Sequence, residues 1–231
     1  MTLRPAATVV LYRADGALLL MQRSLKSSFF PGAYVFPGGV VEAGDVGDVL
    51  PGTKDVWVGH AHAPVAMGGV SGAALCSAYA RAAAREAREE VGLALDPQDL
   101  QPWSRWITPE AEPKRYDTLF FTAPLPSGAI ALGAAEAEQY VFLAPGETLA
   151  RFAAGALMLP PPTYVTIAEL AASAPPYRRE VVFEIMPVLL AIDAKPALVL
   201  PGDPLHPSAP IAWPAPVVPR ILIGQGGWRF A

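Results

Sequence analysis

The sequence predicts an α/β domain, a class in which helices pack on a sheet around an apolar core. Short apolar runs typical of strands alternate along the chain with alanine-rich helical stretches. Hydrophobic residues make up 52% of the 231 residues and charged residues only 16%, so the chain can fill a sizeable core. General disorder is therefore not expected.

The N-terminal segment predicts a β-hairpin. Residues 8–12 and 17–22 are apolar and partly β-branched, and Asp15-Gly16 between them is a turn signal. Residues 27–39 combine four aromatic side chains with prolines and glycines, which predicts a loop, a short strand and a double-glycine turn. Six glycines and two prolines without periodicity follow in residues 46–72, which predicts an inserted excursion, with a brief strand near residues 56–58.

The clearest helix is predicted over residues 77–91, where Ala, Arg and Glu dominate and Gly92 follows as a C-cap. Beyond it we expect strands at 119–122, 140–143 and 181–192 (broken at Pro187) and helices at 149–157 and 167–172, the second after a proline stop at 160–162. We expect one domain over residues 1–195, with the insertion at about 46–76. Residues 196–231 contain eight prolines and predict an extended C-terminal extension that packs on this domain.

Charge and cysteine content limit the class of protein. The net charge of −4 argues against nucleic-acid binding through a general basic surface. No run of about 18 apolar residues free of Pro and Gly occurs, so no membrane span is expected. Cys76 stands alone, which excludes an intrachain disulfide and favours a reducing compartment. The protein is expected to be cytoplasmic.

Three carboxylates share one face of the predicted helix. Glu86, Glu89 and Glu90 stand at positions i, i+3 and i+4, where neighbouring side chains meet. Like charges at this spacing destabilise an isolated helix, and a divalent cation such as Mg²⁺, which prefers oxygen ligands, removes that repulsion. Arg85 stands four residues before Glu89 and can orient it through a salt bridge. Taken alone, such a helix is more often a solvated surface.

The sequence around this helix resembles the signature of the Nudix hydrolase family. Residues 36–45 read FPGGVVEAGD, and residues 85–93 read REAREEVGL, which matches the second half of the signature at every fixed position. Asp45 stands where the family usually has Glu. The larger departure is the gap between the halves, because residues 46–84 number 39 where the signature has seven, an insertion of 32 residues.

This insertion is similar to one in the acyl-coenzyme A diphosphatase branch of the family. Further similarity to that branch lies in residues 30–36, 106–109, 115–118 and 159–163. The resemblance implies a Nudix-type α/β/α sandwich with a mixed sheet. It also implies a metal-dependent diphosphatase (pyrophosphatase) that cleaves the pyrophosphate bond of a nucleoside diphosphate derivative, expected to be coenzyme A or acyl-coenzyme A.

The resemblance also implies roles for individual residues. Mg²⁺ or Mn²⁺ would be held by the three helix glutamates, by a backbone carbonyl of the glycine turn and by an acid from a later loop; these are Glu86, Glu89, Glu90, Gly38 or Gly39, and Glu138 or Glu136. Glu86 or a more distant acid would act as base. Arg85 would be the structural salt-bridge partner, and Arg23 and Arg115 would contact the pyrophosphate, although both are equally explained as surface arginines.

Several alternatives remain at this point. His60-Ala61-His62 is read as a solvated loop rather than a metal pair, and Cys76 as a buried thiol rather than a nucleophile. The glycine turn lacks the lysine of a P-loop. Tyr34, Phe36, Trp103 and Trp106 are read as core, although they could line a pocket.

The substrate is also open. ADP-ribose, another nucleoside diphosphate derivative or a dinucleoside polyphosphate would present the same pyrophosphate, and a non-catalytic nucleotide sensor is the second class of function. The insertion and the extension are the segments expected to carry substrate selectivity or a homodimer contact.

Overall fold

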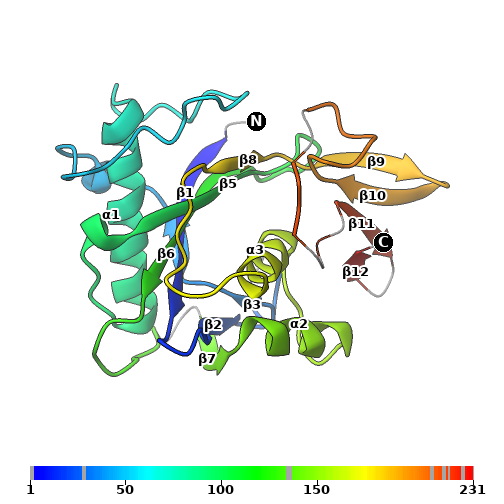
Figure 1. Cartoon of the computed structure of the whole chain (residues 1–231), viewed down its shortest axis with the longest axis horizontal. Coiled ribbons are helices and arrows are strands. Elements are labelled where there is room, and N and C mark those ends of the chain that lie inside the picture. The colour runs from blue at the N-terminus through cyan, green and yellow to red at the C-terminus, as the bar shows by residue number, and fades with distance from the viewer. Residues whose placement is uncertain are drawn as a thin grey trace.

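A mixed sheet lies between helix layers in the computed structural model of the chain (Figure 1). The structure describes residues 3–27, 30–133, 137–208, 211–214, 217, 219–224 and 227–230. The main sheet contains β1 (Arg4–Tyr12), β2 (Leu18–Arg23), β3 (Tyr34–Val35), β4 (Gly38–Val40), β5 (Gln101–Ile107), β6 (Tyr116–Pro124), β7 (Ala137–Leu143) and β8 (Phe183–Ile185). The helices are α1 (Gly72–Val91), α2 (Pro145–Ala153) and α3 (Pro161–Ala171), with short 3₁₀ turns at Ala43–Asp45 and Pro97–Asp99.

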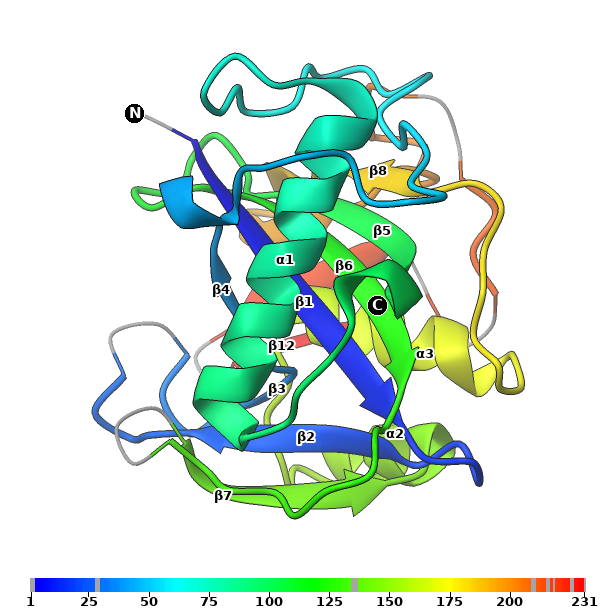
Figure 2. The same ribbon diagram turned by 90° about the vertical axis from the view of Figure 1, so that its left-hand side faces the viewer.

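The strands run in the order β3-β2-β1-β6-β5-β8, with β4 also paired to β1 and β7 to β2. The β1–β6 and β5–β8 pairs are parallel and the other pairs are antiparallel. Helix α1 covers one face of the sheet, and α2 and α3 lie on the opposite side (Figures 1 and 2). The predicted α/β/α sandwich with a mixed sheet is confirmed.

Each face of the sheet has its own apolar core, because successive residues of a strand point to opposite faces. On β1, Val9 and Leu11 join the cluster under α1, whereas Val10 and Tyr12 join the cluster under α3. The predicted hairpin, the break at Pro187 and the helix ending at Gly92 are all present. Within the described residues, no helix is both long and apolar enough to span a bilayer.

The C-terminal extension departs from the prediction of an extended segment. It forms most of a second sheet, of order β12-β11-β10-β9, made of β9 (Val188–Ile192), β10 (Lys195–Val199), β11 (Arg220–Gly224) and β12 (Gly227–Phe230). Proline is disfavoured in the interior of a strand. Here the prolines fall mainly in the connection between β10 and β11, so the short apolar runs on either side can pair. Leu200, Val217 and Ile221 are buried in the core under α3.

Other differences have local causes. Helix α3 begins at Pro161, inside the predicted proline stop, because proline is well suited to the first turn of a helix. Helix α2 likewise begins at Pro145, four residues before the predicted start. Helix α1 begins earlier than predicted, at Gly72. Residues 56–58 form a turn, so the strand predicted there is wrong, and β5 was not predicted.

Candidate active site

The three predicted glutamates lie in the last turns of α1, beside the double-glycine strand β4. The helix ends at Gly92, which has a left-handed backbone (φ 72°) and donates its N–H to the carbonyls of Ala87 and Arg88. This cap fixes where the helix stops. Glu86 and Glu90, one helical turn apart, both reach β4.

Glu90 is bound by the backbone of the first glycine. Its side chain is buried, and its Oε2 accepts the N–H of Gly38 at 2.9 Å. Gly38 pairs with Thr8 of β1, and a Cβ at this glycine would lie 2.6 Å from the Thr8 hydroxyl oxygen. The predicted turn at Gly38-Gly39 is therefore wrong, since these residues belong to strand β4, and only glycine lets this strand pass so close to β1.

Glu86 lies against the second glycine. A Cβ added at Gly39 would overlap the Glu86 carboxylate, with Oε2 only 2.7 Å away. Neither glycine has a positive φ, so backbone conformation does not require them. They are required for space, because side chains and backbone approach them closely. The signature halves, separated by the insertion in sequence, are in direct contact.

Arg85 links the two halves. Its guanidinium donates to both carboxylate oxygens of Asp45 (3.2 and 3.1 Å) and to the Val40 carbonyl (2.8 Å). The same group donates to Glu86 at 2.7 Å and to Glu89 at 3.2 Å. Hydrogen bonding to Asp45 raises the pKa of Arg85 above its ordinary value, so the cation is permanent. Asp45 also accepts the N–H of Glu42 (2.8 Å), and it therefore serves as the anchor for Arg85.

The chemical type of the available donor atoms suits a hard divalent cation. It consists of carboxylate oxygens and glycine carbonyls, the ligands that Mg²⁺ and Mn²⁺ prefer. Within the part of the chain that the structure describes, no three acidic, His or Cys side chains are gathered as ready ligands. Glu86 is bound by Arg85 and Glu90 by Gly38, whereas the Glu89 side chain is 53% exposed.

Two comparisons bear on this geometry. Residues 2–48 match the model of the NUDIX domain family, so the match ends within the first three residues of the insertion. A NUDIX hydrolase from Alicyclobacillus acidocaldarius shares the fold with a TM-score of 0.59 and 23% identity, over 75% of this chain and 93% of that one. Residues 2–48 are therefore similar to a NUDIX domain. Its fold is that of the Nudix hydrolases.

Other solved structures are more distant. A MutT NUDIX hydrolase from Burkholderia pseudomallei is 20% identical (TM-score 0.48), over 72% of this chain and 97% of that one. The NUDIX domain of Shewanella oneidensis NrtR, complexed with ADP ribose, is 14% identical (TM-score 0.48), over 74% of this chain and 88% of that one. No curated protein matches the chain.

The predicted later acid, Glu138, is bonded to the loop that follows β2. Glu138 of β7 accepts the N–H of Leu25 at 3.1 Å, and among the described residues its other hydrogen bond is from the Ser24 hydroxyl. Glu136 lies outside the described residues. The loop just before it reaches the end of α1, because Gly133 donates its N–H to the carbonyl of Glu90 at 2.9 Å.

The two predicted arginine contacts differ in position. Arg23 donates to the Ser27 hydroxyl and lines a cavity next to Gly38 of β4. Arg115 donates to the Thr108 carbonyl at 3.1 Å and does not line this cavity.

The cavity lies next to Gly38, the residue that donates its N–H to Glu90. It has a volume of about 280 Å³, and Gly38 and Thr8 belong to its lining. Most of the lining is apolar, and Arg23 and Glu112 are the charged side chains in it. Phe36 and Trp106, read as core from the sequence, are buried residues that line it, whereas Trp103 is buried elsewhere and donates to Glu169.

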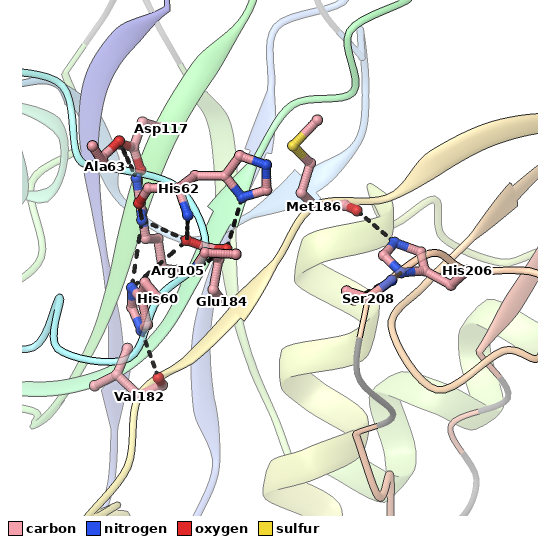
Figure 3. A network of polar contacts seen from close by, with 11 residues as sticks. His60, His62, Ala63, Arg105, Asp117, Val182, Glu184, Met186, His206 and Ser208 are labelled. Carbon is pink, nitrogen blue, oxygen red and sulfur yellow. Dashed lines mark hydrogen bonds and ion pairs between the residues drawn. The ribbon is translucent and has the colours of Figure 1, made fainter.

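A buried polar network on the other face of β5 and β6 was not predicted (Figure 3). Arg105 is fully buried and pairs with Asp117 and Glu184, at 2.7 and 2.6 Å. It also donates to the carbonyls of His62 and Ala63 in the insertion. The only sequence signal was one arginine within an apolar run, QPWSRWI.

The reading of His60-Ala61-His62 as a solvated loop is wrong for His60. Its side chain is 6% exposed and bonds the Val182 carbonyl at 2.8 Å, while half-exposed His62 bonds Glu184. The histidines thus hold the insertion to β8. The reading of Cys76 as a buried thiol is confirmed, and burial raises its pKa to about 12.

Proposed function

We propose that this chain is a metal-dependent Nudix hydrolase that cleaves the pyrophosphate bond of a nucleoside diphosphate derivative, with coenzyme A or acyl-coenzyme A as the expected substrate. One observation carries the proposal. Gly38 lines the cavity and also donates its N–H to Glu90, so the glutamate face and the cavity are adjacent. A substrate with its pyrophosphate at the glutamates would have room for its attached group beside them.

In this proposal, Glu86, Glu89 and Glu90 hold Mg²⁺ or Mn²⁺ together with a carbonyl of Gly38 or Gly39. When bound, the cation supplies Lewis-acid chemistry, neutralising phosphoryl charge and lowering the pKa of water. Glu89, the most exposed of the three, is the one that substrate reaches without a rearrangement.

The remaining residues position these groups. Arg85 holds Glu86 and Glu89 and is itself held by Asp45, so its role is to orient carboxylates rather than to contact substrate. Arg23 lines the cavity, and we expect it to be the arginine that contacts the phosphate oxygens. Arg115 has a weaker claim, because it is bonded to Thr108 outside the lining.

The test is hydrolysis of coenzyme A, decanoyl-coenzyme A, ADP-ribose and a dinucleoside polyphosphate with Mg²⁺, with Mn²⁺ and with chelator. We expect metal-dependent release of 3′,5′-ADP from the coenzyme A compounds. The Glu89→Gln variant should lose on the order of a hundredfold or more in kcat, with an unchanged melting temperature. Glu147→Gln, an equally exposed glutamate of α2, is the matched control.

Other outcomes separate the alternatives. Cleavage of ADP-ribose alone would keep the hydrolase and replace the substrate. Tight binding of one compound without any turnover would move the chain to the class of nucleotide sensors.

A further inference from the structure

The wall of the cavity combines segments that are far apart in the chain. Besides β1, β2 and β4 of the Nudix motif region, it contains residues of β5 and β6, the prolines that open α3, and two residues after β8. These two are Pro187, just before β9, and Leu198 of β10. The insertion contributes no residue to this lining.

The second sheet holds these two residues firmly. His206 bonds the carbonyl of Met186, the neighbour of Pro187, at 2.9 Å (Figure 3). Arg220 of β11 forms a two-pronged ion pair with Asp203, at 2.8 and 3.0 Å. These contacts fix the segments that carry Pro187 and Leu198, so both residues belong to the cavity wall.

The second sheet is also joined to the helix layer. Trp228 of β12 packs against Phe152 of α2 and Tyr164 of α3, with ring centroids 4.9 and 5.7 Å apart. Leu200, which follows β10, and Ile221, the cross-strand partner of Leu198 in β11, are fully buried in the core under α3. The position of Leu198 is therefore set by the same packing that holds α3.

We infer that Leu198 and Pro187 are substrate-specificity residues, and that the group they contact is a largely aliphatic arm attached to the pyrophosphate. This inference rests on the proposed function. Leu198 and Pro187 stabilise an aliphatic arm by removing it from water, whereas a sugar or a further phosphate placed against these two side chains loses hydration without gaining a partner from them. The site therefore favours coenzyme A-type diphosphates over ADP-ribose.

The test compares Leu198→Asn with Leu189→Asn. Leu189 is the cross-strand partner of Leu198 in β9, is 40% exposed and does not line the cavity. The ratio of kcat/KM for decanoyl-coenzyme A to that for ADP-ribose should fall about tenfold in Leu198→Asn, the effect of losing a small apolar contact. It should stay within twofold of the wild type in Leu189→Asn and in the volume-conserving Leu198→Met.

A second readout does not depend on turnover. Dissociation constants for decanoyl-coenzyme A and ADP-ribose are measured by calorimetry with chelator present, and melting temperatures show whether each variant is folded. If the wild type hydrolyses nothing, the proposed function fails, and the binding ratio decides the inference by the same tenfold criterion. An unchanged ratio in folded Leu198→Asn, or a wild-type preference for ADP-ribose, overturns the inference and leaves hydrolase activity untouched.

Discussion

Arg105 and Asp117 form an ion pair in which both side chains are fully buried, with Nη2 and Oδ2 2.7 Å apart. A second bond, from Nε to Oδ1, is also 2.7 Å long, so the guanidinium binds the carboxylate in a bidentate arrangement. The remaining guanidinium N–H groups bond the insertion and Glu184. The pair therefore holds the insertion onto β5 and β6.

Arg105→Met should lower the free energy of unfolding by roughly 3–5 kcal/mol, because it leaves the Asp117 charge buried without its partner. The double variant Arg105→Met, Asp117→Leu should recover part of this loss, since it removes both charges. Urea denaturation monitored by tryptophan fluorescence gives both values. A loss below about 1 kcal/mol in the single variant would contradict the structural role.

Gly39→Ala should reduce kcat about tenfold or more, because the added methyl group would displace the Glu86 carboxylate from its position. Gly44→Ala is the matched control, since a Cβ at Gly44 meets no atom within 4 Å. Steady-state hydrolysis and melting temperatures of both variants separate a site effect from a folding effect. Equal activity in the two variants would mean that Glu86 does not need its place against β4.

Asp45→Asn should weaken the link between the two signature halves and cost roughly 1.5–3 kcal/mol of stability, the range for a hydrogen bond to a charged group. The Asp45 side chain is buried and is held by Arg85 through two bonds. Glu147→Gln breaks an exposed ion pair of α2 and should cost less than about 1 kcal/mol. Chemical denaturation of the two variants under one condition makes the comparison.

The Asp203–Arg220 pair should make stability depend on pH. Hydrogen bonding to Arg220 lowers the pKa of Asp203 below its ordinary value. An aspartate with a lowered pKa in the folded state stabilises the protein above its unfolded pKa, about 3.9, and loses this effect as pH falls through the folded pKa. Asp203→Asn should therefore be less stable than the wild type at pH 7, and the difference should shrink steadily below pH 4. A difference that grows in acid would contradict this assignment.

The parts of the site that follow from local spacing could be predicted from the sequence. The i, i+3, i+4 spacing places the glutamates on one helical face whatever surrounds the helix, and Gly92 marks its end. The contacts of Glu86 and Glu90 with the two glycines of β4 agree with the predicted grouping of these residues.

The parts that depend on distant segments could not be predicted. Arg105 meets Asp117, Glu184 and the insertion only because three strands and a loop come together, and no local pattern marks that meeting. Leu198 is likewise an ordinary apolar residue in a Pro-rich stretch, and its place in the cavity wall depends on the second sheet. The prediction of an extended tail was wrong for the same reason, because the pairing between β10 and β11 is non-local.

Alternate residues of β6 face different sides of the sheet, so their mutations should have different effects. Tyr116, Thr118 and Phe120 line the cavity, while Leu119 and Phe121 join the core beneath α1. A saturation library of this strand should therefore yield variants of the half-buried Tyr116 and Thr118 that shift substrate choice at normal abundance, and variants of Leu119 and Phe121 that deplete soluble protein without changing that choice. Single changes on the cavity side of β6 should therefore alter the substrate range while the domain still folds.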